Sequence, residues 1–176
     1  MSTAVRPATS EFIAFAQSWR FRLYLLRMLP SAFFAGLRVR AISPTECAVS
    51  VPFRWFSQNP FRSIYFACLA MGGELAAGLL AMAHLHRLQP SVSMLVTHCE
   101  AEFVKKATDV AVFTCADGDL LRSAIEESVR SGEGCTVPVR SVGRNAAGEI
   151  VALFTITWSF RPRQPRAMAP LAEVQS

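Results

Sequence analysis

A single carboxylate in an apolar run is the group whose surroundings most directly suggest chemistry. Residues 63–85 contain one acid, Glu74, among mostly apolar or small side chains. A lone ionised carboxylate in such an interior costs several kcal/mol, so Glu74 must be paired, protonated or open to a polar cleft. It is therefore a candidate general base or nucleophile; the alternative is a structural carboxylate bonded to the amides of a neighbouring strand. On a helix, its neighbours three and four residues away cannot pair with it: Ala70, Met71, Ala77 and Gly78.

Asn59 lies fifteen residues before Glu74, in the loop that leads into the same run. Asn-Pro alone is an ordinary turn signal, which favours a structural role. Ser63 is the expected N-cap of the helix, and a helix rises about 16 Å between Ser63 and Glu74. Asn59 and Glu74 of one chain are therefore too far apart to share a substrate. They can meet only if a second, antiparallel copy lies alongside, as in a two-fold dimer.

The elements that position these residues follow from the hydrophobic pattern. Helical spacing of apolar side chains predicts one helix over 11–29, ending before Pro30; these side chains are Phe12, Phe15, Ala16, Trp19, Leu23 and Leu26. A polar helix is expected over 119–130 and tails over 1–10 and 161–176. The pattern predicts one α+β domain over 11–160, with an antiparallel sheet wrapped around the apolar helix 63–85. The expected strands are 36–42, 47–53, 94–104, 109–115, 135–142 and 150–160.

Length, composition and charge narrow the class of protein. A chain of 176 residues suits one domain, and the 52% apolar content suggests an apolar interface in an oligomer. The net charge of +5 favours anionic partners, but no Lys/Arg-rich block indicates nucleic acid. The five cysteines and three histidines lack metal-ligand spacing. We therefore expect buried free thiols, exposed or helix-capping histidines, no metal and a cytoplasmic location, since residues 1–10 contain no signal-peptide core.

Taken together, these features resemble a known family. Asn59, a short loop, a long Ala/Gly-rich helix with an acid fifteen residues on, and a following run of strands are similar to the hotdog-fold acyl-CoA thioesterases. The phenylacetate-degradation-type thioesterases and the related DUF4442 family look closest, and the resemblance covers about residues 30–160. It implies a sheet curled around the central helix, assembly as dimers or tetramers, and active sites between subunits. These sites hydrolyse the thioester of an acyl-CoA and need no metal or organic cofactor.

Carried over by position, the resemblance also implies roles for single residues. Asn59 would help to place substrate or water, and Glu74 would activate water or attack the thioester carbonyl. Where the closest enzymes have His-Gly-Gly, this chain has Tyr65-Phe66-Ala67. The Phe66 N–H at the first turn still provides an oxyanion donor, while its ring adds bulk near the substrate.

The remaining candidates are substrate contacts. Basic side chains near the cleft mouth would hold the CoA phosphates, with ordinary solvated surface charge as the alternative. Plentiful apolar lining favours a fatty or aromatic acyl group. The predicted substrate-binding residues are Ser63, Tyr65, Met71, Arg62, Lys105, Lys106 and Arg144.

Two other functions fit the same sequence. One is a non-catalytic module that binds acyl-CoA or an acyl chain, which is favoured if Phe66 blocks the thioester position. The other is a peripheral membrane protein anchored by the basic amphipathic helix 11–29, although such helices more often pack onto their own core. The run 63–85 is long enough to span a bilayer. Its central Glu74 and the lack of a second span favour a buried helix instead.

Overall fold

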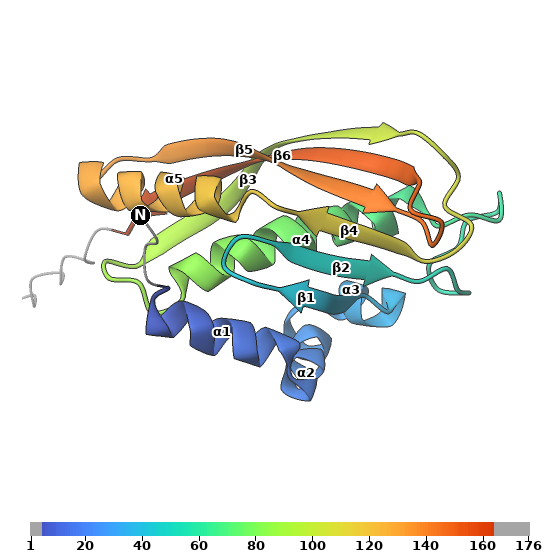
Figure 1. Ribbon diagram of the computed structural model, residues 1–176, viewed down its shortest axis with the longest axis horizontal. Coiled ribbons are helices and arrows are strands. Elements are labelled where there is room, and N and C mark those ends of the chain that lie inside the picture. Colours follow the sequence, from blue (N-terminus) through green and yellow to red (C-terminus); the bar gives the residue numbers. More distant parts are fainter. Residues whose placement is uncertain (1–4, 164–176) are drawn as a thin grey trace, which may run out of the picture.

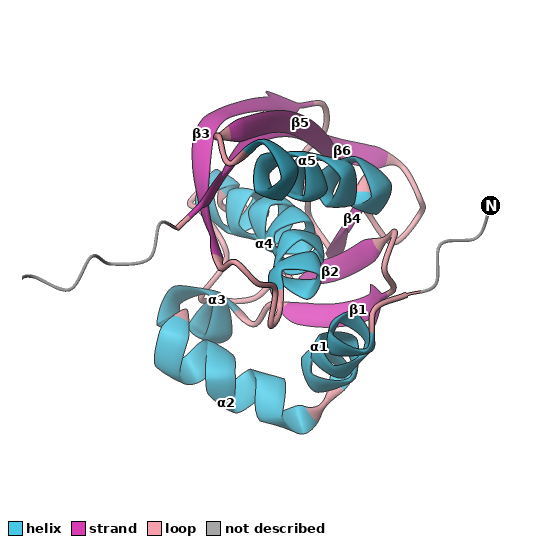
Figure 2. Cartoon of the chain, turned by 90° about the vertical axis from the view of Figure 1, so that its left-hand side faces the viewer, coloured by secondary structure: helices cyan, strands magenta, loops and turns pink. Residues whose placement is uncertain are grey.

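A six-stranded antiparallel sheet curls around one long helix, and three short helices lie on the side that the sheet leaves open (Figure 1). The computed structural model describes residues 5–163. Figure 2 shows the sheet curling over and beside the long helix, with the three N-terminal helices below. The predicted α+β architecture, an antiparallel sheet wrapped around a central helix, is confirmed. Of the predicted C-terminal tail, residues 164–176 lie outside the described residues.

Three helices come first along the chain, and pairs of strands then alternate with single helices. Neighbouring strands are antiparallel, in the order β1-β2-β4-β5-β6-β3. The strands are β1 (Arg38–Ile42), β2 (Cys47–Val51), β3 (Val92–Phe103), β4 (Ala111–Cys115), β5 (Cys135–Arg144) and β6 (Ile150–Pro162). The helices are α1 (Pro7–Gln17), α2 (Trp19–Met28), α3 (Pro30–Ala35), α4 (Phe66–Leu85) and α5 (Gly118–Ser131). Each predicted strand therefore lies within two residues of its observed bounds.

Alternating burial in the strands reproduces the period of two read from the sequence. Along β6, Phe154, Ile156 and Trp158 are buried against α4, while Leu153 and Thr155 are less buried. β5 likewise buries Val139 and exposes Arg140. Successive side chains of a strand point to opposite faces, so the apolar set forms one continuous surface for the helix.

The single helix predicted over 11–29 is wrong, because the chain breaks at Ser18. Ser18 has extended backbone angles, φ −84° and ψ 160°, and its hydroxyl donates to the Phe15 carbonyl at 2.7 Å. The side chain thus takes a backbone acceptor that a continuing helix would use, a competition typical of serine. Helical structure also begins at Pro7, so residues 7–10 are not a tail.

The break changes which side chains of the second helix face inward. α2 buries Phe21 and Leu25, whereas the predicted inward side chains Trp19, Leu23 and Leu26 are exposed. A continuous helix would keep these three in line with Phe12 and Ala16 of α1, which are buried. Because Ser18 between α1 and α2 is not helical, the inward side of α2 is no longer in line with that of α1.

α4 is covered on every side because it is apolar all round. It contacts β2, β4, β5 and β6 across the sheet and α1, α3 and α5 around the rest. Its length and composition would also suit a membrane span, but 67% of its most hydropathic window is buried inside the protein. Gly72 and Gly73 allow the close approach to the sheet. A Cβ at Gly72 would lie 2.4 Å from Val51 Cγ2 and 2.8 Å from Phe113 Cδ2.

The substitution Gly72→Val tests this close approach. Its side chain would overpack the contact between α4, Val51 and Phe113, so we expect the free energy of unfolding to fall by about 1–3 kcal/mol. Urea denaturation followed by circular dichroism measures the change. Gly134→Val is the matched control, since the nearest atom to its Cβ is 3.9 Å away; it should stay within about 0.5 kcal/mol of wild type. Equal stability of both variants would contradict the packing argument.

Candidate functional site

The start of α4 forms the floor of a pocket of about 570 Å³. The pocket lies between the loop before α4, the end of β3 and the segment that follows β3. It brings together six of the ten predicted site residues, namely Asn59, Ser63, Tyr65, Phe66, Lys105 and Lys106. Apolar side chains that the sequence analysis did not single out complete the lining: Pro60, Phe61, Ile64, Leu69, Phe103, Val104 and Ala107.

Asn59 organises the loop that forms one wall of this pocket. Its amide oxygen accepts hydrogen bonds from the backbone N–H of Phe61 at 3.0 Å and of Ser63 at 3.3 Å. The Ser63 hydroxyl also donates to this oxygen at 3.2 Å and accepts from Asn59 Nδ2 at 3.1 Å. This is the Asx-turn chemistry expected of Asn-Pro. Asn59 therefore has a structural role in holding the loop.

Ser63 does not cap α4 as predicted, because its hydroxyl is engaged with Asn59. The N-cap position is Tyr65, which has extended backbone angles and makes no side-chain capping bond. The first N–H groups of a helix have no intrahelical partner. Among the described residues, the Phe66 N–H has no hydrogen-bond partner. A negatively charged oxygen in the pocket would meet this donor at the positive end of the helix dipole.

Aromatic rings extend from this helix start to the core. Phe66 is 56% exposed and lies edge-on to Tyr65, with ring centroids 4.9 Å apart. Phe66 also contacts Phe103 at 6.3 Å, and Phe103 contacts buried Phe154 at 5.9 Å. The missed residue Phe103 therefore connects the pocket to the core. Its position near the end of a long predicted strand was the available signal.

Glu74 lies two turns further along α4 than the pocket, about 12 Å from Phe66 along the helix axis. Within residues 5–163 its carboxylate makes no hydrogen bond or ion pair, so the alternative of a carboxylate bonded to strand amides is not observed. Burial raises the pKa of this carboxyl above its ordinary value. Burial first, and then the negative charge of Glu74, raises the pKa of Cys99 on β3. A Cβ built at Gly78 would lie 3.2 Å from Glu74 Oε1 and 3.5 Å from the Trp158 ring, so the carboxylate lies on the side of α4 that faces β6.

The predicted basic side chains differ in whether they already have a partner. Lys105 Nζ binds both carboxylate oxygens of Glu149, at 2.7 and 2.8 Å. Arg144 donates to the Gly148 carbonyl of its own hairpin at 2.9 Å. Lys106 is exposed on the pocket rim and has no ion-pair partner among the described residues. Lys106 is thus the cation most available to an anion in the pocket.

Two further predicted residues lie outside the pocket lining. Met71 is partly buried and packs against the core on α4, between the pocket and Glu74. Arg62 is exposed in the same loop as Asn59, with a φ of +57°. Its side chain makes no hydrogen bond or ion pair within residues 5–163. Its two neighbours in sequence, Phe61 and Ser63, both line the pocket.

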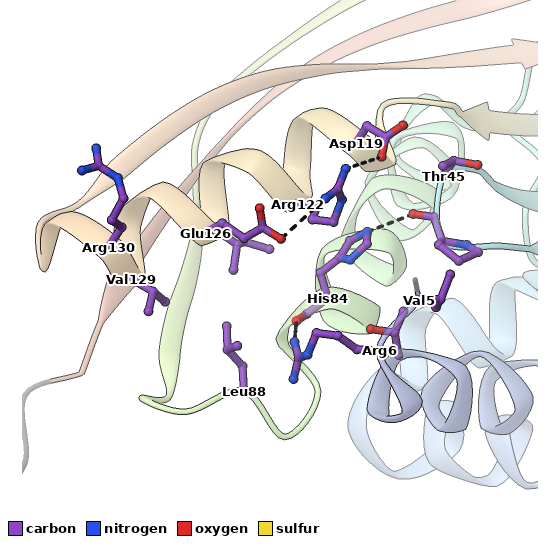
Figure 3. Close-up of a pocket in the computed structure, with 13 residues that line it drawn as sticks. Val5, Arg6, Thr45, His84, Leu88, Asp119, Arg122, Glu126, Val129 and Arg130 are labelled. Atoms are coloured by element: carbon purple, nitrogen blue, oxygen red, sulfur yellow. Dashed lines mark hydrogen bonds and ion pairs between the residues drawn. The ribbon is translucent and has the colours of Figure 1, made fainter. Parts of the chain in front are cut away.

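A second cavity of about 520 Å³ lies between the start of α1, the end of α4 and α5 (Figure 3). The prediction of exposed or capping histidines is wrong for His84, which is buried there with Nε2 2.9 Å from the Pro44 carbonyl. Burial lowers the pKa of its imidazole. Arg122 is held by Asp119 at 3.0 Å and Glu126 at 3.6 Å. Among the described residues that line this cavity, both carboxylates are therefore paired with Arg122, unlike that of Glu74.

Metal and thiol chemistry find no support in the part of the chain that the structure describes. It contains no group of three His, Cys, Asp or Glu side chains that could hold a metal ion. All five cysteines are free, as predicted, but Cys99 is exposed rather than buried. Burial raises the pKa of Cys47 to about 12 and that of Cys115 to about 11. These neighbours across β2 and β4 therefore stay protonated.

Several solved structures are similar to this one in fold. A structure from Pseudomonas aeruginosa, described as a probable thioesterase, is 17% identical with a TM-score of 0.68 and covers 88% of this chain and 96% of its own. A thioesterase from Haemophilus influenzae is 11% identical with a TM-score of 0.59, covering 82% and 92%. A mutant of the phenylacetic acid degradation protein PaaI from Thermus thermophilus is 17% identical with a TM-score of 0.53, covering 75% and 98%. At these identities the likeness shows a shared fold.

No curated protein matches the sequence. The family described as "Domain of unknown function (DUF4442)" matches residues 17–160, which include the central helix, every strand bar the last two residues of β6, and the whole pocket lining. With its sheet curled around α4, the chain has the fold of the hotdog thioesterase superfamily. It belongs to the DUF4442 family.

Proposed function

We propose that the protein is an acyl-CoA thioesterase whose active site forms between two copies of the chain. The observation that carries this proposal is Glu74, a carboxylate without a partner among the described residues, on a mostly apolar core helix beside the Trp158 ring of β6. Retaining such a group costs stability, which a role in chemistry would explain. The thioesterase names of similar structures support the same reaction class.

A second copy is needed because the two halves of the site are separated on one chain. About 12 Å of helix lies between the Phe66 N–H and Glu74. β3 is twelve residues long and largely exposed, and within residues 5–163 it pairs only with β6. Its free edge is a template for pairing with another strand. Two-fold pairing of β3 with its copy would run the two α4 helices antiparallel, so the start of one can approach Glu74 of the other.

The proposed reaction divides its steps between the two subunits. Glu74 of one subunit takes a proton from water, and the water oxygen attacks the thioester carbonyl carbon. The carbonyl oxygen gains negative charge and accepts a hydrogen bond from the Phe66 N–H of the other subunit. Collapse of the intermediate breaks the C–S bond, and the CoA sulfur receives the proton from Glu74. The raised pKa of the carboxyl makes it a stronger base than an exposed glutamate.

The pocket provides contacts for both parts of the substrate. Lys106 on the rim and Arg62 in the adjoining loop offer positive charge to the CoA phosphates, whereas Lys105 is already neutralised by Glu149. Phe61, Leu69 and other apolar lining residues suit a fatty or aromatic acyl group. Asn59 acts as a positioning residue by fixing the loop.

A non-catalytic acyl-CoA binding module is the second candidate. It is favoured by the Tyr65 and Phe66 rings, which both stand exposed at the pocket where a thioester would have to approach the helix start. The two functions differ in whether the C–S bond breaks. A panel of acyl-CoAs assayed for free thiol separates them, since a binding module retains affinity without turnover.

Glu74→Gln tests the general base. The amide has nearly the same shape but cannot accept the proton from water, so we expect kcat to fall by about 100- to 10,000-fold. Release of free thiol from acyl-CoA gives the rate. Glu133→Gln, which alters an exposed carboxylate in the loop after α5, should retain wild-type turnover. Unchanged turnover in Glu74→Gln would remove this residue from the mechanism.

Phe66→Pro tests the oxyanion donor. Proline removes the N–H but suits the first position of a helix, and Tyr65 already has the extended backbone that a following proline requires. We expect kcat to fall by about 100- to 1,000-fold. Phe66→Ala is the control, because it keeps the N–H and should retain activity.

Mixing the two inactive variants distinguishes a composite site from one within a single chain. In a heterodimer of Phe66→Pro and Glu74→Gln, one of the two sites receives both intact residues. Random reassortment of subunits should therefore restore roughly a quarter of the wild-type rate. A mixture that stays inactive after subunit exchange would show that the residues do not act across an interface.

The pH dependence of stability provides a test that is independent of substrate. The folded pKa of Glu74 lies above its ordinary value of 4.5, so between these pH values the folded state binds more protons than the unfolded state. The free energy of unfolding should therefore fall as the pH rises through this range. Urea denaturation across pH should show a smaller fall for Glu74→Gln than for wild type. Superimposable pH profiles would contradict the buried, unpaired position of the carboxyl.

A further inference from the structure

The outward face of α2 combines apolar and basic side chains. Trp19, Leu23 and Leu26 follow one another at helical spacing and are exposed, Trp19 by 72%. Arg20 and Arg27 lie beside this stripe and are also exposed. Phe21 and Leu25 hold the opposite side of α2 in the core. We call the five exposed residues the α2 face.

Exposed aromatic rings continue this surface beyond α2. Arg22 lies over the ring of Phe33 in α3, 5.0 Å from its centroid. Phe33 contacts Phe34 at 5.4 Å, and exposed Phe34 contacts exposed Phe56 at 5.9 Å. Trp55, next to Phe56, is 82% exposed. The α2 face thus leads through α3 to a second group of exposed rings.

The part of the chain that contains the α2 face is strongly basic. Residues 12–73 contain seven arginines and a single acid, Glu46. None of these arginines forms an ion pair within residues 5–163. Their positive charge is therefore not neutralised locally, and the surface would attract an anionic partner over a distance of about a Debye length.

The position of α2 leaves this face open. α2 lies at the outside of the molecule, on the side of α4 away from β3, β5 and β6, in both views (Figures 1 and 2). Its main contacts are with α1 and α3. None of its residues lines the pocket at the start of α4. The α2 face is therefore separate from the proposed catalytic groups.

We propose that the α2 face binds the surface of an anionic lipid bilayer. A helix lying in the plane of the interface inserts its Trp and Leu side chains at the level of the headgroups, while flanking arginines contact lipid phosphates. Trp55 and Phe56 add a second insertion point. The absence of acidic residues on α2, α3 and the Trp55–Phe56 segment favours an anionic bilayer over a neutral one.

Vesicle flotation and tryptophan fluorescence test the proposal with the full chain. The protein should float with vesicles of phosphatidylglycerol and phosphatidylcholine but not with phosphatidylcholine alone, and added salt should release it. Two of the three tryptophans, Trp19 and Trp55, are exposed on the proposed surface, while Trp158 is buried. Their emission should therefore shift to shorter wavelength when anionic vesicles are added. Wild-type protein that stays free of anionic vesicles overturns the proposal.

Paired substitutions distinguish this surface from general basic charge. Arg20→Glu with Arg27→Glu should weaken partitioning into anionic vesicles at least about tenfold, whereas Arg140→Glu, an exposed arginine on β5, should have a much smaller effect. Trp19→Ser with Leu23→Ser should weaken it similarly, and Leu120→Ser, which alters an exposed leucine of α5, should not. Equal loss in the α2 variants and their controls would contradict the assignment.

Sedimentation velocity of the same variants examines the other possible occupant, a second copy of the chain. If Trp19→Ser with Leu23→Ser converts an oligomer to monomer, the α2 face is an interface between copies and the lipid proposal is wrong. Unfolding curves that match wild type would show that the substitutions act at the surface. These readouts use no thioester, so they succeed or fail independently of the proposed hydrolysis.

Discussion

The need to cover an apolar helix on all sides determines the architecture of this protein. α4 has no polar face to offer to water, so elements must surround it. The sheet covers one side, and α1 and α3 occupy part of the other. Gly72 and Gly73 bring the helix close enough for the rings of Phe113 and Phe154 to fill the space. Glu74 interrupts this apolar surface near the middle of the helix, and the proposed chemistry depends on that interruption.

The sheet and the central helix could be predicted because their patterns report local geometry. In β6, each alternate residue from Phe154 to Phe160 is buried, which a period of two in the sequence already indicates. The break at Ser18 was missed because it depends on one side chain bonding to the Phe15 carbonyl. The helical spacing of apolar residues continues through Ser18, and it does not show to which carbonyl the serine hydroxyl donates.

The candidate site was predicted in part, for a similar reason. Lys106 was predicted from the family resemblance. Position along the chain was enough to bring Asn59 and Phe66 to one pocket, since the loop before α4 is short. It could not show that Glu149 neutralises Lys105, because that pair joins residues forty-four positions apart. Nor could it show that Ser63 bonds to Asn59 and leaves the helix start uncapped.

Cys99 gives this fold a convenient experimental property. Cys47, Cys68 and Cys115 are enclosed, and Cys135 is partly covered, so the thiol on β3 is the most open of the five. It lies on the free edge of the sheet, near the Glu74 carboxylate. A thiol reagent would therefore reach Cys99 in a single copy without entering the packed interior. Its reactivity would fall if two copies paired along β3, so the native sequence already carries a reporter of that assembly.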